Sequence, residues 1–174
     1  MTRLKPTLLA LSASGLLAIA GYEGYSATAY KDTGGISTVG FGHTGPEVKP
    51  GTRVTVVQAL NTLGKDVGKT ERALQSCFGD DVLLTHGEWD AYVALAYNVG
   101  AGAVCKSSIR PKLRAGQYRA ACEAIRSFNT AKVRARQPDG TVVVRRVVSK
   151  GLTNRRNSEY QKCVQGIESE QISP

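Results

Sequence analysis

Residues 21–44 read GYEGYSATAYKDTGGISTVGFGHT, and this stretch decides how the rest of the chain is interpreted. Glycines crowd into it among Tyr, Thr and Val residues. Glycine supplies tight turns, whereas β-branched and aromatic residues favour strands. The stretch therefore predicts short strands joined by tight turns.

Helical periodicity follows on the C-terminal side. Apolar residues recur at three- and four-residue steps over residues 54–77, which predicts a helix that could connect two lobes. Thr85-His86-Gly87-Glu88 has the pattern of a capping box and predicts a second helix that ends near Gly100. Within it, Trp89 and Tyr92 are expected in the core, and His86 is expected to be exposed.

Shorter helices are predicted over 108–115 and 117–128, with Gly116 as the stop between them. A last helix is predicted over 153–164, with Gly166 as its C-terminal stop. The fold class is therefore α+β, with a small N-terminal α/β lobe containing a short antiparallel sheet, and a larger, mostly helical C-terminal lobe.

Residues 131–148 predict a basic β-hairpin around the turn Pro138-Asp139-Gly140. The hairpin lies in the basic part of the chain. Residues 1–100 carry 8 Lys and Arg against 9 Asp and Glu, whereas residues 101–174 carry 15 against 5. Such an imbalance indicates a polyanionic partner, either nucleic acid or an anionic cell envelope, or else a solvated surface that keeps the protein soluble.

The cysteines are Cys77, Cys105, Cys122 and Cys163. They form no CxxC pair or Cys/His cluster, which argues against a zinc site. Four cysteines allow three pairings. Two disulfides are expected if the chain is exported, and buried thiols if it stays in a reducing compartment.

The N-terminus bears on that choice. Arg3 and Lys5 precede a charge-free stretch over 6–22, a pattern that favours a cytoplasmic N-terminus with the rest translocated. A cleaved signal peptide, an uncleaved signal-anchor and an ordinary buried helix all fit. Cleavage after Ala20 would leave Glu23 third from a new and frayed end. A catalytic role for Glu23 would therefore favour the anchor, with the cleaved signal second, and either one leads to an oxidising space.

Glu23 and Asp32 lie nine residues apart, and Thr38 follows six residues later. Glu23 falls where the apolar run ends, and the other two fall among the strands and turns. Two carboxylates across a cleft suit glycoside hydrolysis, because one donates a proton to the leaving oxygen and the other works from the opposite face of the sugar. The spacing alone is a weak signal, since surface carboxylates are far commoner than catalytic pairs.

The surrounding blocks are more specific. Glu23-Gly-Tyr, Tyr30-Lys-Asp-Thr-Gly-Gly35 and Ser37-Thr-Val-Gly-Phe-Gly-His-Thr44 resemble the active-site block of the phage-type lysozymes, glycoside hydrolase family 24. The residues 98–102 and 151–156 resemble later family blocks, so the resemblance spans about residues 21–165.

The resemblance implies a lysozyme-like fold and an endolysin that cleaves the β-1,4 bond between N-acetylmuramic acid and N-acetylglucosamine for host cell lysis and phage release. It implies that Glu23 is the general acid, that Asp32 acts on the water side and that Thr38 positions the water, with inversion of configuration. No metal or organic cofactor is expected. Asn154 is either a sugar-binding residue or a helix-start residue.

The resemblance also implies a structural role for His43, bonded to an acid across the lobe. Arg155 and Arg156 either contact peptide carboxylates of peptidoglycan or balance Glu159. The disulfides Cys77–Cys105 and Cys122–Cys163 are expected as static bridges, because the apolar segment holds no cysteine for switching.

The apolar segment resembles the signal-arrest-release segments of this group. The implied organisation is a signal-anchor over 1–22, a catalytic domain over 23–168 and a tail over 169–174. The expected partners are peptidoglycan, the Sec export machinery and the bacterial inner membrane through residues 6–22, with no nucleic acid and a monomeric state. The chain would first face the periplasm from the host inner membrane and then be released into the periplasm.

Two other functions remain open. A lytic transglycosylase needs a single catalytic Glu and leaves an anhydro sugar, and the match at Asp32 and Thr38 argues against it. A non-catalytic protein that binds the envelope or nucleic acid would use the basic hairpin over 133–148 as its surface.

Overall fold

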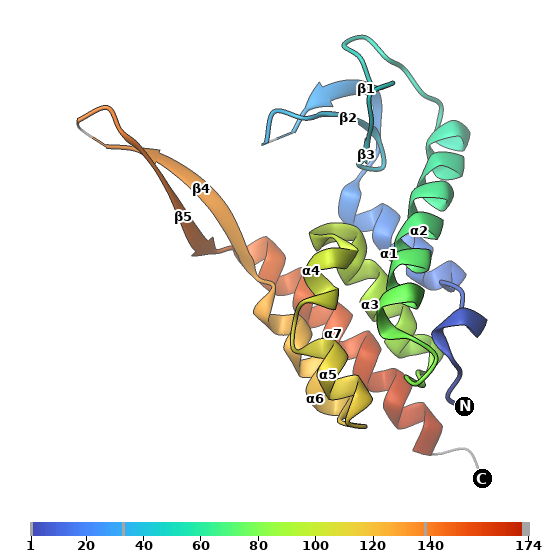
Figure 1. Cartoon of the computed structure of the whole chain (residues 1–174). Coiled ribbons are helices and arrows are strands. Elements are labelled where there is room, and N and C mark those ends of the chain that lie inside the picture. The colour runs from blue at the N-terminus through green and yellow to red at the C-terminus, as the bar shows by residue number, and fades with distance from the viewer. Residues whose placement is uncertain (1, 33, 138, 172–174) are drawn as a thin grey trace.

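The computed structural model describes residues 2–32, 34–137 and 139–171 of the 174-residue chain. A small sheet lies at one end, a helical body fills the other, and a two-stranded hairpin projects from the body (Figure 1). The elements in chain order are η1 (Pro6–Leu8), α1 (Ala13–Glu23), β1 (Ser26–Lys31), β2 (Ser37–Gly40), β3 (His43–Thr44), α2 (Val56–Phe78), α3 (His86–Val99), α4 (Ala101–Cys105), α5 (Ile109–Arg114), α6 (Tyr118–Ala124), η2 (Ile125–Ser127), β4 (Thr130–Arg136), β5 (Val142–Val148) and α7 (Lys150–Gln171). The expected α+β class with a small sheet-containing lobe and a larger helical lobe is confirmed.

The strands predicted over 21–44 form one antiparallel sheet in the order β1-β2-β3. At the reversal between β2 and β3, Gly40, the last residue of β2, has φ +66° and Gly42 in the turn has φ +77°, a region of backbone space that side chains disfavour. These two glycines therefore allow the chain to reverse within a few residues.

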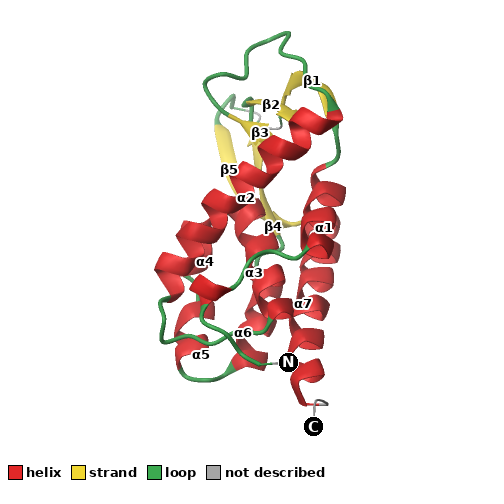
Figure 2. Ribbon diagram, turned by 90° about the vertical axis from the view of Figure 1, so that its right-hand side faces the viewer, coloured by secondary structure: helices red, strands yellow, loops and turns green. Residues whose placement is uncertain are grey.

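The helix α2 connects the two ends of the molecule, as its periodicity predicted (Figure 2). It packs against β2 and β3 near its start and against α3 and α4 further along. Thr55 and Gln58 form a capping box at its N-terminus, so the chain enters the helix with its first amide groups satisfied.

The helix α3 forms the centre of the helical body. The predicted capping box is present, because Thr85 Oγ1 accepts from the Glu88 amide and Glu88 Oε2 accepts from the Thr85 amide. Trp89 and Tyr92 are fully buried, which confirms them as core residues. His86 is exposed, as expected.

The end of the chain differs from the sequence prediction. The helix α7 extends beyond 153–164 at both ends, and Gly166 lies inside it rather than at its stop. A Cβ atom on Gly166 would lie 2.8 Å from the Gly87 Cα, so this glycine allows α7 to approach α3 closely. The predicted tail over 169–174 overlaps the helix, which ends at Gln171, and residues 172–174 lie outside the described part of the chain. The helix α4 was also not predicted.

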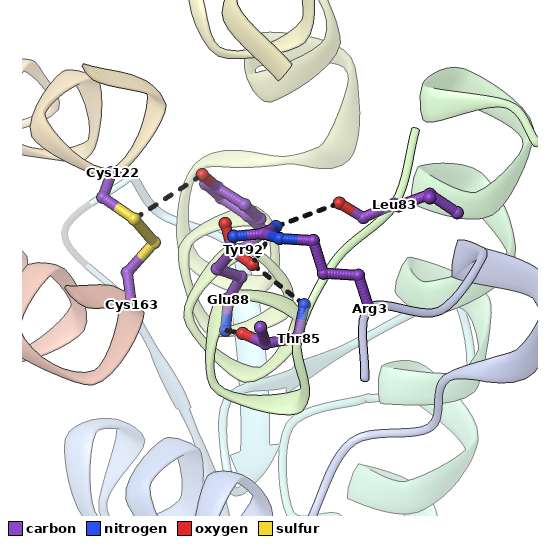
Figure 3. The surroundings of a disulfide bond; sticks show 7 residues. All are labelled: Arg3, Leu83, Thr85, Glu88, Tyr92, Cys122 and Cys163. Carbon is purple, nitrogen blue, oxygen red and sulfur yellow. Dashed lines mark hydrogen bonds and ion pairs between the residues drawn. A yellow bond between two sulfur atoms is a disulfide. The ribbon is translucent and has the colours of Figure 1, made fainter. Parts of the chain in front are cut away.

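Two disulfides join the helices of the body. Cys77 bonds Cys105 across a sequence separation of 28 residues, and Cys122 bonds Cys163 across 41. This is the expected pairing. The second bridge ties α6 to α7, and the Tyr92 hydroxyl donates to Cys122 Sγ at 3.9 Å (Figure 3).

The first residues of the chain pack along the helical body. Leu4 forms a backbone bridge with Leu84, and the Arg3 guanidinium contacts Glu88 beside Thr85 (Figure 3). The apolar run over 6–22 is divided between η1 and α1, with an extended segment between them. Among the described residues, no helix combines the length and apolarity needed to cross a membrane.

Candidate active site

Glu23 is the last residue of α1, where the helix meets the sheet. The helix ends because Gly24 adopts φ +69° while its amide still donates to the Ala20 carbonyl. The Glu23 side chain is 20% exposed, and its Oε1 accepts a hydrogen bond of 2.8 Å from Arg155 Nη1 on α7. A residue near the C-terminal end of the chain thus holds a carboxylate near the N-terminal end.

Arg155 is itself fixed by several neighbours. Its Nε lies 3.2 Å from Glu159 Oε1, its Nη2 donates to the Ala94 carbonyl at 3.4 Å, and the guanidinium carbon lies 4.6 Å from the Tyr22 ring centroid. Its side chain is only 9% exposed. Because these contacts leave the guanidinium little freedom, Arg155 can orient Glu23.

The fully buried Arg156 forms an ion pair of 2.8 Å with Glu159. Burial raises the pKa of Glu159, and the two neighbouring guanidinium groups oppose that shift. Of the two roles considered for Arg155 and Arg156, balancing Glu159 is confirmed. Contact of Arg156 with substrate carboxylates is wrong, since the side chain cannot reach solvent.

A pocket of about 380 Å³ opens beside Glu23. Glu23 Oε2 lies 3.0 Å from where a Cβ on Gly42 would stand, so a side chain there would press on the carboxylate. Burial and the nearby Asp66 and Glu23 carboxylates raise the pKa of Tyr97, whose hydroxyl donates to the Phe41 carbonyl. The lining consists of Glu23, Gly42, Thr44, Asp66, Lys69, Thr70, Tyr97 and Asn98.

Asp32 lies in the turn between β1 and β2. Its Oδ1 accepts two hydrogen bonds of 2.8 Å, from the amides of Gly34 and Ile36. Its own amide donates to the Ile36 carbonyl at 2.9 Å. Among the described residues both donors bond to Oδ1, so Oδ2 is the oxygen that these contacts leave for a water molecule or substrate.

Thr38 lies on β2, and its residue is 4% exposed. Its hydroxyl donates to the Ile36 carbonyl at 3.2 Å, which leaves the oxygen lone pairs to accept from a water. Thr38 is the cross-strand partner of Thr44, and such partners share one face of a sheet. Thr38 therefore lies on the same sheet face as a residue that lines the Glu23 pocket.

The three residues are thus not gathered into one pocket. Of the described residues, those that line the Glu23 pocket include neither Asp32 nor Thr38. Glu23 belongs to the junction of α1 and α7, whereas Asp32 and Thr38 belong to the sheet. The two carboxylates therefore belong to different elements, Glu23 to the end of α1 and Asp32 to the turn between β1 and β2.

His43 is held between two acids. Its Nδ1 lies 2.5 Å from Asp66 Oδ2 on α2, and its Nε2 lies 2.7 Å from Glu47 Oε1. Burial alone would lower the pKa of His43, but the hydrogen bonds and charges of Asp66 and Glu47 outweigh it and raise the pKa above 6.5. The ring thereby ties β3 to α2.

Asn154 is exposed in the first part of α7, directly before Arg155. A role in sugar binding stays a prediction. Among the described residues, no group of three or more His, Cys, Asp or Glu side chains could hold a metal ion.

Two residues and one contact of the site region were not identified from the sequence. They are the pocket residues Asp66 and Tyr97, and the contact of Arg155 with Glu23. Asp66 and Thr70 are spaced by four on α2, which places both on one helix face. That spacing was a usable signal. The contact between Arg155 and Glu23 joins residues 132 positions apart and leaves no local signal.

A helix that ends on a carboxylate beside a small antiparallel sheet, next to a helical lobe, is the arrangement expected of a lysozyme-like glycosidase. The profile of the phage lysozyme family matches residues 20–159. The chain belongs to this family, and it is a peptidoglycan hydrolase of the lysozyme type, as the resemblance implied.

Individual relatives are consistent with the family match. The SAR-endolysin of Pseudomonas phage phiKMV is 33% identical over 163 residues, covering 93% of this chain and 91% of the relative. The endolysin of Escherichia coli O157:H7 phage FAHEc1 superposes with a TM-score of 0.75 at 31% identity, covering 96% of this chain and 98% of the other.

The P1 phage endolysin Lyz has been solved in two forms. The active form gives a TM-score of 0.72 at 25% identity, covering 90% of this chain and 85% of the other. The secreted inactive form gives a TM-score of 0.56 at 24% identity, covering 91% and 97%. The arrangement of this chain is therefore nearer to that of the active form.

Proposed function

We propose that the chain hydrolyses the β-1,4 bond between N-acetylmuramic acid and N-acetylglucosamine, with Glu23 as general acid. Asp32 activates the attacking water, and the Thr38 hydroxyl holds that water. Attack from the face opposite the leaving group inverts the anomeric carbon. Asn154, on α7 of the C-terminal lobe, contacts the sugar.

One observation carries this proposal. Glu23 stands at the rim of a polar pocket, and Arg155 fixes one carboxylate oxygen while the other lies toward Gly42. A general acid must be positioned before it can protonate a leaving oxygen, and a side chain anchored at one oxygen meets that requirement. The fixed orientation of Asp32 by two amides supports its separate role.

The test is the turnover of purified peptidoglycan and the identity of its products. We expect Glu23→Gln and Asp32→Asn each to lower kcat by roughly 100-fold or more, because each removes a proton-transfer group. The exposed Glu123→Gln, on α6, is the control and should leave kcat unchanged. New reducing ends in the α configuration support inversion. Anhydro products, or full activity of Glu23→Gln, would refute the proposal.

We also propose that residues 1–22 first tether the protein in the host inner membrane after Sec export and are then released uncleaved into the periplasm. The relatives named SAR-endolysin support this order of events. So does the position of Glu23, because the segment that would leave the membrane ends on the catalytic acid. The packing of Ile19 in the core and the likeness to the active P1 form fit the released state.

Cell fractionation with N-terminal sequencing tests the tether. The proposal expects an intact N-terminus both in the membrane fraction before depolarisation and in the periplasmic fraction after it. A mature protein that starts at Gly21 would show that the segment is a cleaved signal instead.

A further inference from the structure

The hairpin formed by β4 and β5 separates its charges by face. Alternate residues of a strand share a face, and cross-strand partners share it too. The register pairs Lys132 with Arg146, Arg134 with Val144 and Arg136 with Val142. One face, here called the basic face, therefore carries Lys132, Arg134, Arg136 and Arg146. On the opposite face, Arg145 is the one charged residue of the two strands, and it pairs with Val133.

The cations of the basic face are exposed and uncompensated. In the described part of the chain, none of the four forms an ion pair. The one acidic side chain of the hairpin, Asp139, is bonded to Thr141 at the turn. The face is thus an open array of positive charge, which suits it to attract an anionic ligand from outside the chain.

Part of the basic face borders a pocket that the hairpin shares with the β1–β2 turn. A pocket of about 620 Å³ is lined by Lys132, Arg134, Val144 and Ala131 of the hairpin, and by Gly34 of the β1–β2 turn. The Gly34 amide donates to Asp32, so this space adjoins the second proposed catalytic carboxylate. Figure 1 shows the hairpin projecting on the side to which the β1–β2 turn points.

We propose that the basic face binds the carboxylates of the stem peptides that peptidoglycan carries, while the glycan strand lies at Asp32. The inference rests on the proposed function and adds the substrate feature that the enzyme selects. Each muramic acid bears a short peptide with free carboxylates, so a bound strand presents anionic groups beside the cleft. Guanidinium groups suit carboxylates because their paired N–H donors match the two oxygens.

Nucleic acid fits the hairpin less well. Neither strand contains an aromatic residue on which a base could stack. A membrane surface also fits less well, since Lys132 and Arg134 line a pocket shared with Gly34 rather than an outward patch.

The hairpin supplies its own matched control. Arg134 and Arg145 are both exposed, and each stands opposite a valine, but they lie on opposite faces. The variants are Lys132→Gln with Arg134→Gln, against Arg145→Gln. Each is assayed for kcat/KM on purified peptidoglycan and on glycan strands from the same preparation whose peptides an amidase has removed.

We expect the double variant to lose on the order of tenfold in kcat/KM on peptide-bearing peptidoglycan, as two exposed charge contacts would give. It should match wild type on peptide-free strands, and Arg145→Gln should match wild type on both. Soluble stem peptide should inhibit the wild type and Arg145→Gln more strongly than the double variant, which gives a readout independent of glycan cleavage.

Several results would overturn the inference. Equal losses on both substrates would assign the cations to the glycan or to folding. A loss for Arg145→Gln as large as that of the double variant would indicate general charge attraction. Unchanged turnover with weaker binding to anionic phospholipid vesicles would assign the face to a membrane. A wild type that cleaves neither substrate would instead refute the proposed function.

Discussion

Arg155 Nη1 lies 2.8 Å from Glu23 Oε1, and this contact joins the last helix to the end of the first. Arg155 also contacts Glu159, which Arg156 contacts as well. Both arginines therefore contact Glu159, but of the two only Arg155 pairs with Glu23 in the described part of the chain. That difference allows the orientation of Glu23 to be tested separately from the stability of the buried cluster.

We expect Arg155→Gln to lower kcat by about 10- to 100-fold with little change in KM, since a misplaced catalytic group slows the chemical step. Arg156→Gln should unfold more easily, by about 3 kcal/mol, because it leaves Glu159 partly unpaired in the core. It should nevertheless keep most of its kcat when the folded protein is assayed. Equal kcat values for the two variants would mean that Arg155 does not orient Glu23.

The pH dependence of stability should report His43. Asp66 and Glu47 raise its pKa in the folded state above 6.5. The group therefore contributes stability that is complete below about pH 6.5 and is lost as the pH rises through the folded-state pKa. Free energies of unfolding from pH 5 to 9 should show wild type losing its advantage over His43→Gln across that window.

The exposed His86→Gln is the control for that measurement. It should follow the wild-type profile. A difference between wild type and His43→Gln that stays constant from pH 5 to 9 would contradict the assigned coupling to Asp66 and Glu47.

The approach of α7 to α3 predicts opposite effects for two Gly→Ala changes. A Cβ on Gly166 would meet Thr85 Oγ1 at 2.7 Å and Gly87 Cα at 2.8 Å, so Gly166→Ala should destabilise by about 1–3 kcal/mol. A Cβ on Gly64, inside α2, meets nothing within 4 Å. Gly64→Ala should stabilise by roughly 0.5–1 kcal/mol. Urea unfolding measures both, and a neutral Gly166→Ala would show that the helices can separate without cost.

The contact of Arg3 with Glu88 should stabilise the docked N-terminal segment. Arg3 Nη1 lies 2.8 Å from Glu88 Oε2. The Glu88 side chain is fully buried, and the Arg3 side chain is 14% exposed. Burial raises the pKa of Glu88 despite the opposing effect of Arg3. We expect Arg3→Gln to cost about 3 kcal/mol, because a buried carboxylate loses its partner.

A double-mutant cycle with Glu88→Gln isolates that pair. Arg114→Gln, which breaks a surface pair with Asp81, should change stability by only about 0.5 kcal/mol. If Arg3→Gln behaves like Arg114→Gln, the segment is held by its apolar contacts rather than by this ion pair.

The sequence by itself determined the local structure and the family. Turn glycines and β-branched residues identified the sheet, and the capping box at Thr85 and Glu88 identified the start of α3. Each of these signals is contained within a few residues, where backbone preference and side-chain spacing decide the outcome. The block over 21–44 indicated the family for the same reason.

Only the tertiary structure decided how distant segments meet. From the sequence, Gly166 is expected to end a helix, yet it lies inside α7. Glycine is needed there because Gly87 of α3 leaves no room for a Cβ atom. Arg155 is one of many arginines in the sequence. It becomes the partner of Glu23 because α1 and α7 both pack against α3. Such contacts depend on the three-dimensional path of the chain, so no spacing within the sequence encodes them.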